Sequence, residues 1–217
     1  MKNRSRLTTH YRHTLPLIAA GLLAILGLWI VLAPAESRLG GVVKLVFLHG
    51  ALVRVGLALF TVAGLIGLVA LLFRRPVWYR GTLAAGTAAL VVWILYVISS
   101  MVVTGLAWGQ VVAWNEPRVR ATASILLAAI VVAIASRLVD HPVFTALASL
   151  AMGIVPWVIV AQADAIRHPI DPIGGSESTS IQLFYWLIVA TMAGLAAVLV
   201  AWLWMRLELR ARERESE

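Results

Sequence analysis

The 217-residue chain is 61% hydrophobic and only 13% charged, with a formal net charge of +8. Its mean hydropathy of +0.92 excludes a soluble domain of this length and indicates an integral membrane protein. Cysteine is absent, which excludes disulfide bonds, thiolate metal ligands and a dithiol redox couple.

Six apolar segments are long enough to cross a hydrocarbon core, which needs roughly 20 helical residues. Each carries Leu, Ile, Val and Ala on all faces, as expected where lipid and neighbouring helices are both apolar. No internal repeat or low-complexity segment divides the chain. We therefore predict an all-α, polytopic fold that forms a single integral membrane domain over residues 1–217, with spans at about 15–33, 48–73, 81–106, 121–138, 143–163 and 181–205.

The first segment has a second interpretation, because residues 1–37 also have the features of a secretory signal peptide. A basic start is followed by an apolar core and by the A-x-A cleavage site Ala33-Pro34-Ala35. Cleavage there would leave five spans. The apolar core is at the long end for a signal peptide, so we expect the segment to remain as a span.

Lysine and arginine are unevenly distributed between the connectors, which predicts that both termini lie in the cytoplasm. Twelve of these residues fall in the termini and in the second and fourth connectors, and five fall in the other three connectors. Positively charged connectors are retained on the cytoplasmic side, so the first, third and fifth connectors are expected outside. A multi-pass protein of the cell membrane, surrounded by lipid, accounts for the charge without a nucleic-acid partner.

The second segment opens on the outer side with KLVFLHGALVR, which supplies His49 near its start. Arg54 follows inside the segment, where it is the one charged residue that lies away from the ends of the predicted spans. Its long side chain could simply extend outward to the interface.

The outer connector after the third segment reads WGQVVAWNEPRVR and spans residues 108–120. Asn115 followed by Glu-Pro predicts the start of the fourth helix, with Asn115 as its N-cap. The start of a helix at this point does not explain why tryptophan occupies positions 108 and 114. Tryptophans at span ends usually form an aromatic belt, which is the alternative here and the interpretation we favour for Trp29, Trp78, Trp157, Trp186, Trp202 and Trp204.

The last outer connector, DAIRHPIDPIGGSEST, supplies His168. His49 and His168 are expected on the outer side, at a depth similar to that of the tryptophan connector, while three histidines are expected inside: His10, His13 and His141. Asp164 could accept the ring N–H of His168 if the fifth helix continues that far. Pro169 counts against this, because the residue before a proline disfavours helical angles.

These outer residues suit a haem. Two neutral imidazoles can bind the iron axially, aromatic faces can stack on the porphyrin, and cations can bind its propionates. The outer cations are Arg38, Lys44, Arg54, Arg118, Arg120 and Arg167. A solvated histidine, an aromatic belt and interfacial charges remain the structural alternatives for the same residues.

The tryptophan connector resembles the signature of the cytochrome c assembly protein family, which reads roughly W-G-x-x-W-x-W-D. The matching residues are Trp108-Gly109 and, after four intervening residues, Trp114-Asn115. Valines occupy positions 111 and 112, where the family usually has an aromatic residue, and Asn115 stands where it has aspartate.

Among that family, the six-span haem exporter protein C type is the most similar. Its members carry one haem-ligating histidine near the outer start of the second span and another in the last outer connector, the positions of His49 and His168. The resemblance implies that these two residues are axial ligands of a transient, non-covalent haem b and that Arg54, Arg118 and Arg120 are candidates for the propionates or the interface. The implied haem platform consists of Trp108, Gly109, Trp114 and Asn115.

The function implied is haem handling in cytochrome c maturation, not enzymatic catalysis. The implied partners are a haem chaperone and ABC-type haem export components. Two other classes stay open: a small transporter or scaffold without a cofactor, and a haem-binding anchor subunit of a redox complex. A transporter should have polar residues converging at mid-bilayer, whereas an anchor usually needs haem nearer the midplane. The polar residues that end the third segment are more easily explained as helix-packing residues: Ser99, Ser100 and Thr104.

Overall fold

A computed structural model describes residues 2–37, 39–164, 166 and 173–216, and within 2–13 it describes the backbone alone. The described chain contains six helices, each long and apolar enough to cross a membrane. The predicted all-α, six-span fold is therefore confirmed. The helices are α1 (Lys2–Leu32), α2 (Val43–Phe73), α3 (Pro76–Trp108), α4 (Pro117–Val139), α5 (Pro142–Gln162) and α6 (Thr179–Ser216).

Proline begins three of the helices, since it needs no hydrogen-bond partner and its fixed φ suits the first helical position. Before α4 this overturns one prediction, because the N-cap is Glu116 with extended backbone angles, not Asn115. Pro117 is the physical reason, since it disfavours helical angles at the residue before it. Asn115 lies one residue outside the helix and is exposed.

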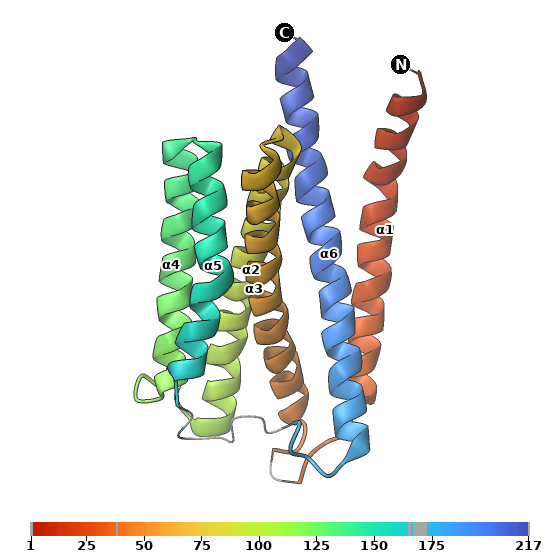
Figure 1. Ribbon diagram of the computed structural model, residues 1–217. Coiled ribbons are helices and arrows are strands. Elements are labelled where there is room, and N and C mark those ends of the chain that lie inside the picture. Colours follow the sequence, from red (N-terminus) through yellow and green to blue (C-terminus); the bar gives the residue numbers. More distant parts are fainter. Residues whose placement is uncertain (1, 38, 165, 167–172, 217) are drawn as a thin grey trace.

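The helices form a bundle in which α2 packs against α3, α5 and α6. The α4–α5 hairpin covers one side of this centre, and α1 packs against α6 on the opposite side (Figure 1). Both chain ends lie at the end of the bundle where α2 joins α3 and α4 joins α5, which we call the terminal end. The α1–α2, α3–α4 and α5–α6 connectors lie at the other end, the loop end (Figure 1).

Small residues bring α2 and α5 into backbone contact. A Cβ atom placed on Gly64 would lie 3.1 Å from the Cα atom of Gly153, and one placed on Gly67 would lie 2.8 Å from the carbonyl oxygen of Ala146. Because lipid competes for apolar side chains as well as another helix does, close packing of small residues is a main source of association between membrane helices. The sequence of α2 therefore specifies where α5 crosses it.

Trp93 joins three helices near the middle of α3. Its side chain is fully buried, its Nε1 donates to the carbonyl oxygen of Thr122 on α4 at 3.2 Å, and it meets the edge of Phe60 on α2. Gly56 makes room for the indole, since a Cβ atom there would lie 2.9 Å from the ring. This contact sets the position of α3 between α2 and α4.

An ion pair joins α3 to α6 near the terminal end. Arg80 donates two hydrogen bonds to Glu208, with Nε at 2.7 Å and Nη2 at 2.9 Å, and the two side chains are 27% and 21% exposed. Two parallel hydrogen bonds in a partly buried site should stabilise the fold more than a typical surface ion pair does. We therefore expect Glu208→Gln to cost about 1 kcal/mol of stability.

Thermal unfolding in detergent at low and high salt measures this cost. Glu213→Gln, at an exposed position of the same helix, is the matched control. Equal unfolding temperatures for the two variants would show that the pair contributes nothing.

Candidate functional site

His49 lies in the second turn of α2 and faces α3. Its imidazole stacks on the ring of Tyr96, with 4.8 Å between ring centroids and 29° between the planes. Its Nδ1 lies 3.3 Å from the hydroxyl oxygen of Ser99. The hydroxyl of Tyr96 in turn lies 3.1 Å from that of Thr122, so α4 supports the platform on which the imidazole rests.

The hydrogen bonds of Ser99 assign the tautomer of His49. The single hydroxyl proton of Ser99 is donated to the carbonyl oxygen of Tyr96 at 2.7 Å. The serine oxygen can then only accept from the imidazole, which places the ring proton on Nδ1. In the neutral ring this leaves the lone pair on Nε2, the form in which histidine binds a metal while its other nitrogen is held by a second residue.

Arg54 faces α6, away from this platform. It follows His49 by five residues, which is about 140° around a helix. Its Nε donates to the hydroxyl of Tyr185 at 2.7 Å, and its guanidinium carbon lies 5.2 Å from the ring centroid of Trp186. Gly50 lets Tyr185 approach, since a Cβ atom there would lie 3.2 Å from that ring. We expected Trp186 to belong to the aromatic belt, and in the structure its ring also makes a cation–π contact with Arg54.

The tryptophan connector lies further toward the loop end than His49 does. Trp108 ends α3 and is half-buried, and Gly109 caps the helix with a left-handed φ of 70°. Trp108 follows Ser99 by nine residues, which is about 13 Å along the helix axis. The expectation of similar depth therefore fails, because His49 lies inside α2. One ligand could contact both residues only by extending along the helix axis.

Trp114 is 61% exposed, which leaves its indole available to a partner at the loop end. Arg120 donates from Nη1 to the carbonyl oxygen of Trp114 at 3.4 Å. Arg118 precedes Thr122 by one turn and so lies on the side of α4 that supports the His49 platform.

Glu116 is a site residue that sequence reasoning missed. Its side chain is 1% exposed, and its Oε1 accepts a hydrogen bond from the backbone N–H of Ile166 at 3.0 Å. It therefore ties the start of α4 to the α5–α6 connector, two residues before His168. A glutamate in a helix start suggests only a favourable helix-dipole charge, so no local signal predicts this contact.

Removing this carboxylate should loosen the connector. We expect Glu116→Ala to cost about 1 kcal/mol, because the backbone N–H of Ile166 loses its acceptor in a part-buried contact. Glu116→Gln should cost less, since its amide oxygen can still accept. Hydrogen exchange at the α5–α6 connector measures the change. Glu177→Ala, at an exposed position of that connector, is the control, and unchanged exchange in Glu116→Ala would contradict the anchoring role.

His168 lies outside the described residues. Asp164, predicted as its hydrogen-bond partner if the fifth helix continued, is exposed and non-helical. Helix α5 ends at Gln162, and Ala163 has an extended backbone, so the one-turn spacing that the prediction required is absent.

Comparison with known proteins adds no further assignment. No protein-family model matches the sequence, and no curated protein matches it.

Proposed function

We propose that this protein handles haem at the loop end of the bundle. His49 would be one axial ligand and His168 the other, with haem b held non-covalently and released. The observation that carries the proposal is the setting of His49, whose ring stacks on Tyr96 and whose Nδ1 lies 3.3 Å from the hydroxyl of Ser99, as the second nitrogen of a metal-binding histidine is commonly held.

The neighbouring residues fit this group. Tyr96 is buried and packs against both His49 and Trp93, so it holds the imidazole in place for the iron. Arg118 would place a cation for a propionate on the same side of α4. His49 and His168 would together hold the haem iron through their imidazoles. No open position then remains for chemistry, so we propose holding and release rather than catalysis.

The connectors would present the haem to a partner. Glu116 anchors the α5–α6 connector beside α4, and the exposed indole of Trp114 offers an aromatic surface at the same end. The charge asymmetry of the connectors supports an outward-facing loop end in the cell membrane, with both termini in the cytoplasm. Together with the resemblance of the tryptophan connector, this supports a role in cytochrome c maturation, with a haem chaperone and ABC-type export components as partners.

A second candidate gains support from the depth of His49. This residue is the seventh of α2 and lies within the apolar span, not at its edge. A haem-binding anchor subunit of a redox complex would place a ligand there. The two candidates differ in retention, since a redox anchor keeps its haem while a haem-handling protein surrenders it to an acceptor.

Purification in detergent from haem-replete cells tests the proposal. We expect an absorption spectrum of low-spin haem, and transfer of that haem to apomyoglobin added in excess. A haem-bearing protein that never loses haem to the acceptor would favour the redox anchor. A colourless protein that takes up no added haem would refute both.

A further inference from the structure

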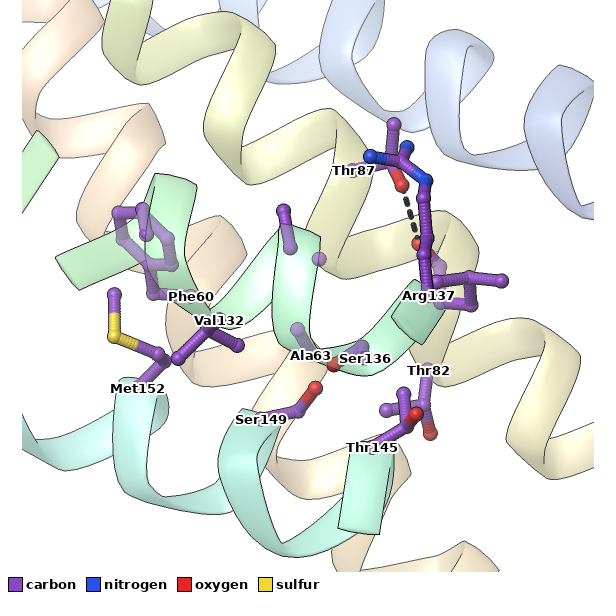
Figure 2. Close-up of a pocket in the computed structure, with 14 residues that line it drawn as sticks. Phe60, Ala63, Thr82, Thr87, Val132, Ser136, Arg137, Thr145, Ser149 and Met152 are labelled. Carbon is purple, nitrogen blue, oxygen red and sulfur yellow. Dashed lines mark hydrogen bonds between the residues drawn. The ribbon is translucent and has the colours of Figure 1, made fainter. Parts of the chain in front are cut away.

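A small cavity lies between α2, α3, α4 and α5, toward the terminal end and away from His49. Its volume is about 40 Å³. Five hydroxyl side chains from three helices line it: Thr82, Thr87, Ser136, Thr145 and Ser149 (Figure 2). Serine and threonine are common where membrane helices pack closely, so the hydrogen bonds of these hydroxyls decide whether they could bind a ligand.

The hydrogen bonds of these hydroxyls divide them into two groups. Thr82 and Thr87 donate within α3 to carbonyl oxygens one turn earlier, at 3.0 and 2.8 Å. The side chains of the other three, Ser136, Thr145 and Ser149, are only 8%, 9% and 7% exposed, they border the cavity, and they make no hydrogen bond to another described residue. Serine and threonine in helices commonly bond to their own preceding turn. Here three donors are instead left for whatever occupies the cavity.

The surroundings favour a negative charge. Arg137 is exposed and lies at the rim of the cavity, with its guanidinium beside Thr87 (Figure 2), and in the last turn of α4 it offsets the negative end of that helix. Thr145 belongs to the first turn of α5, where the positive end of the helix dipole lies. No carboxylate lines the cavity among the described residues, and Asp140 in the adjoining connector is exposed. Hydroxyl donors, a guanidinium and a helix N-terminus recognise an anion, whereas a cation would need carboxylate or carbonyl ligands.

Size restricts the anion. One water molecule needs roughly 10–15 Å³ of such space, so the cavity holds about three waters. Sites for organic ligands are much larger, at about 300 Å³ or more. The space suits a single monatomic ion and excludes a nucleotide, a haem or an organic acid of several carbons.

We propose that this cavity binds one halide-sized inorganic anion through the hydroxyls of Ser136, Thr145 and Ser149, with Arg137 beside it. The bound ion joins α4 to α5 where this hairpin packs on α2 and α3. Because it binds only where the four helices meet, it stabilises the folded bundle in proportion to its concentration. This inference is independent of the haem proposal, which concerns the opposite end.

Chloride and bromide are the probes. Equilibrium dialysis with radiolabelled chloride, on protein purified in detergent and sodium gluconate, should show saturable binding of one ion per chain. Bromide should displace it, and replacing gluconate with bromide should raise the unfolding temperature. Exchanging sodium for choline should change neither result.

The double variant Ser149→Ala and Thr145→Val removes two donors at little change in volume. It should lose at least tenfold in chloride affinity and lose the bromide-induced rise in unfolding temperature. In gluconate it should be as stable as wild type, since the hydroxyls removed have no protein partner. Thr191→Val is the matched control, because that buried hydroxyl bonds within α6.

The contribution of the Arg137 charge to anion binding is tested in the same way. Arg137→Gln should weaken chloride binding, whereas Arg75→Gln, at an exposed position of the same end, should not. Absence of saturable chloride binding would overturn the proposal and leave a hydrated cavity. A bromide-induced rise in unfolding temperature that persists in the double variant would also overturn the proposal, since it would be a general salt effect.

Discussion

Gly67→Leu should prevent α5 from packing on α2 and so abolish the folded bundle. A Cβ atom at this position would lie 2.8 Å from the backbone oxygen of Ala146, and backbone cannot move aside as a flexible side chain does. Even Gly67→Ala should cost about 1–3 kcal/mol through overpacking, although alanine favours a helix over glycine by about 1 kcal/mol. Thermal unfolding in detergent, with size-exclusion chromatography for aggregation, measures both variants.

Gly27 in α1 supplies the control. Nothing lies within 4 Å of a Cβ atom placed there, so Gly27→Ala should leave stability unchanged or raise it, and Gly27→Leu should still yield a folded protein. If the Gly67 and Gly27 variants behaved alike, the α2–α5 crossing described above would be wrong.

His49→Ala should lower haem affinity at least about 100-fold. Residues that merely orient a metal ligand contribute roughly 10–100-fold, so the ligand itself should contribute no less. Ser99→Ala should fall in that smaller range, because it removes the acceptor that fixes the tautomer but leaves the imidazole. Titration of detergent-solubilised protein with haem, followed by absorbance, gives both affinities.

His141→Ala is the matched control for this loss. His141 is exposed and precedes α5 at the terminal end, so its removal should leave haem affinity unchanged. Equal affinities for wild type and His49→Ala would remove His49 from the site, even if the protein bound haem elsewhere.

The spans were predictable because apolar length decides them, whereas their ends depend on other terms. The fourth span was expected from residue 121, yet α4 begins at Pro117, since the polar PRVR turn is helical as well. The sixth was expected to end near residue 205, yet α6 runs to Ser216 through arginine, leucine and glutamate, all strong helix formers. Hydropathy detects only the apolar part of a helix, so it does not predict polar turns that extend the helix beyond the span.

The site was harder to predict because it depends on how helices face one another. Ser99 was interpreted as a packing residue, and the sequence holds no sign that it faces His49 fifty positions earlier. Both helices are apolar all round, so no stripe marks the contacting faces. The burial of Glu116 depends similarly on the path of a distant connector. His49 was singled out because the predicted topology places it on the outer side, and Arg54 because it is a charge inside a span, but their different orientations follow only from the packed bundle.

Electron paramagnetic resonance of the purified ferric protein tests the central claim most directly, because the spectrum reports the axial ligands of the iron. Two imidazoles predict a low-spin signal in wild type, converted to high-spin or lost in His49→Ala and in His168→Ala. A high-spin wild-type signal, a low-spin signal that survives both substitutions, or no haem signal after reconstitution would contradict ligation by these two histidines.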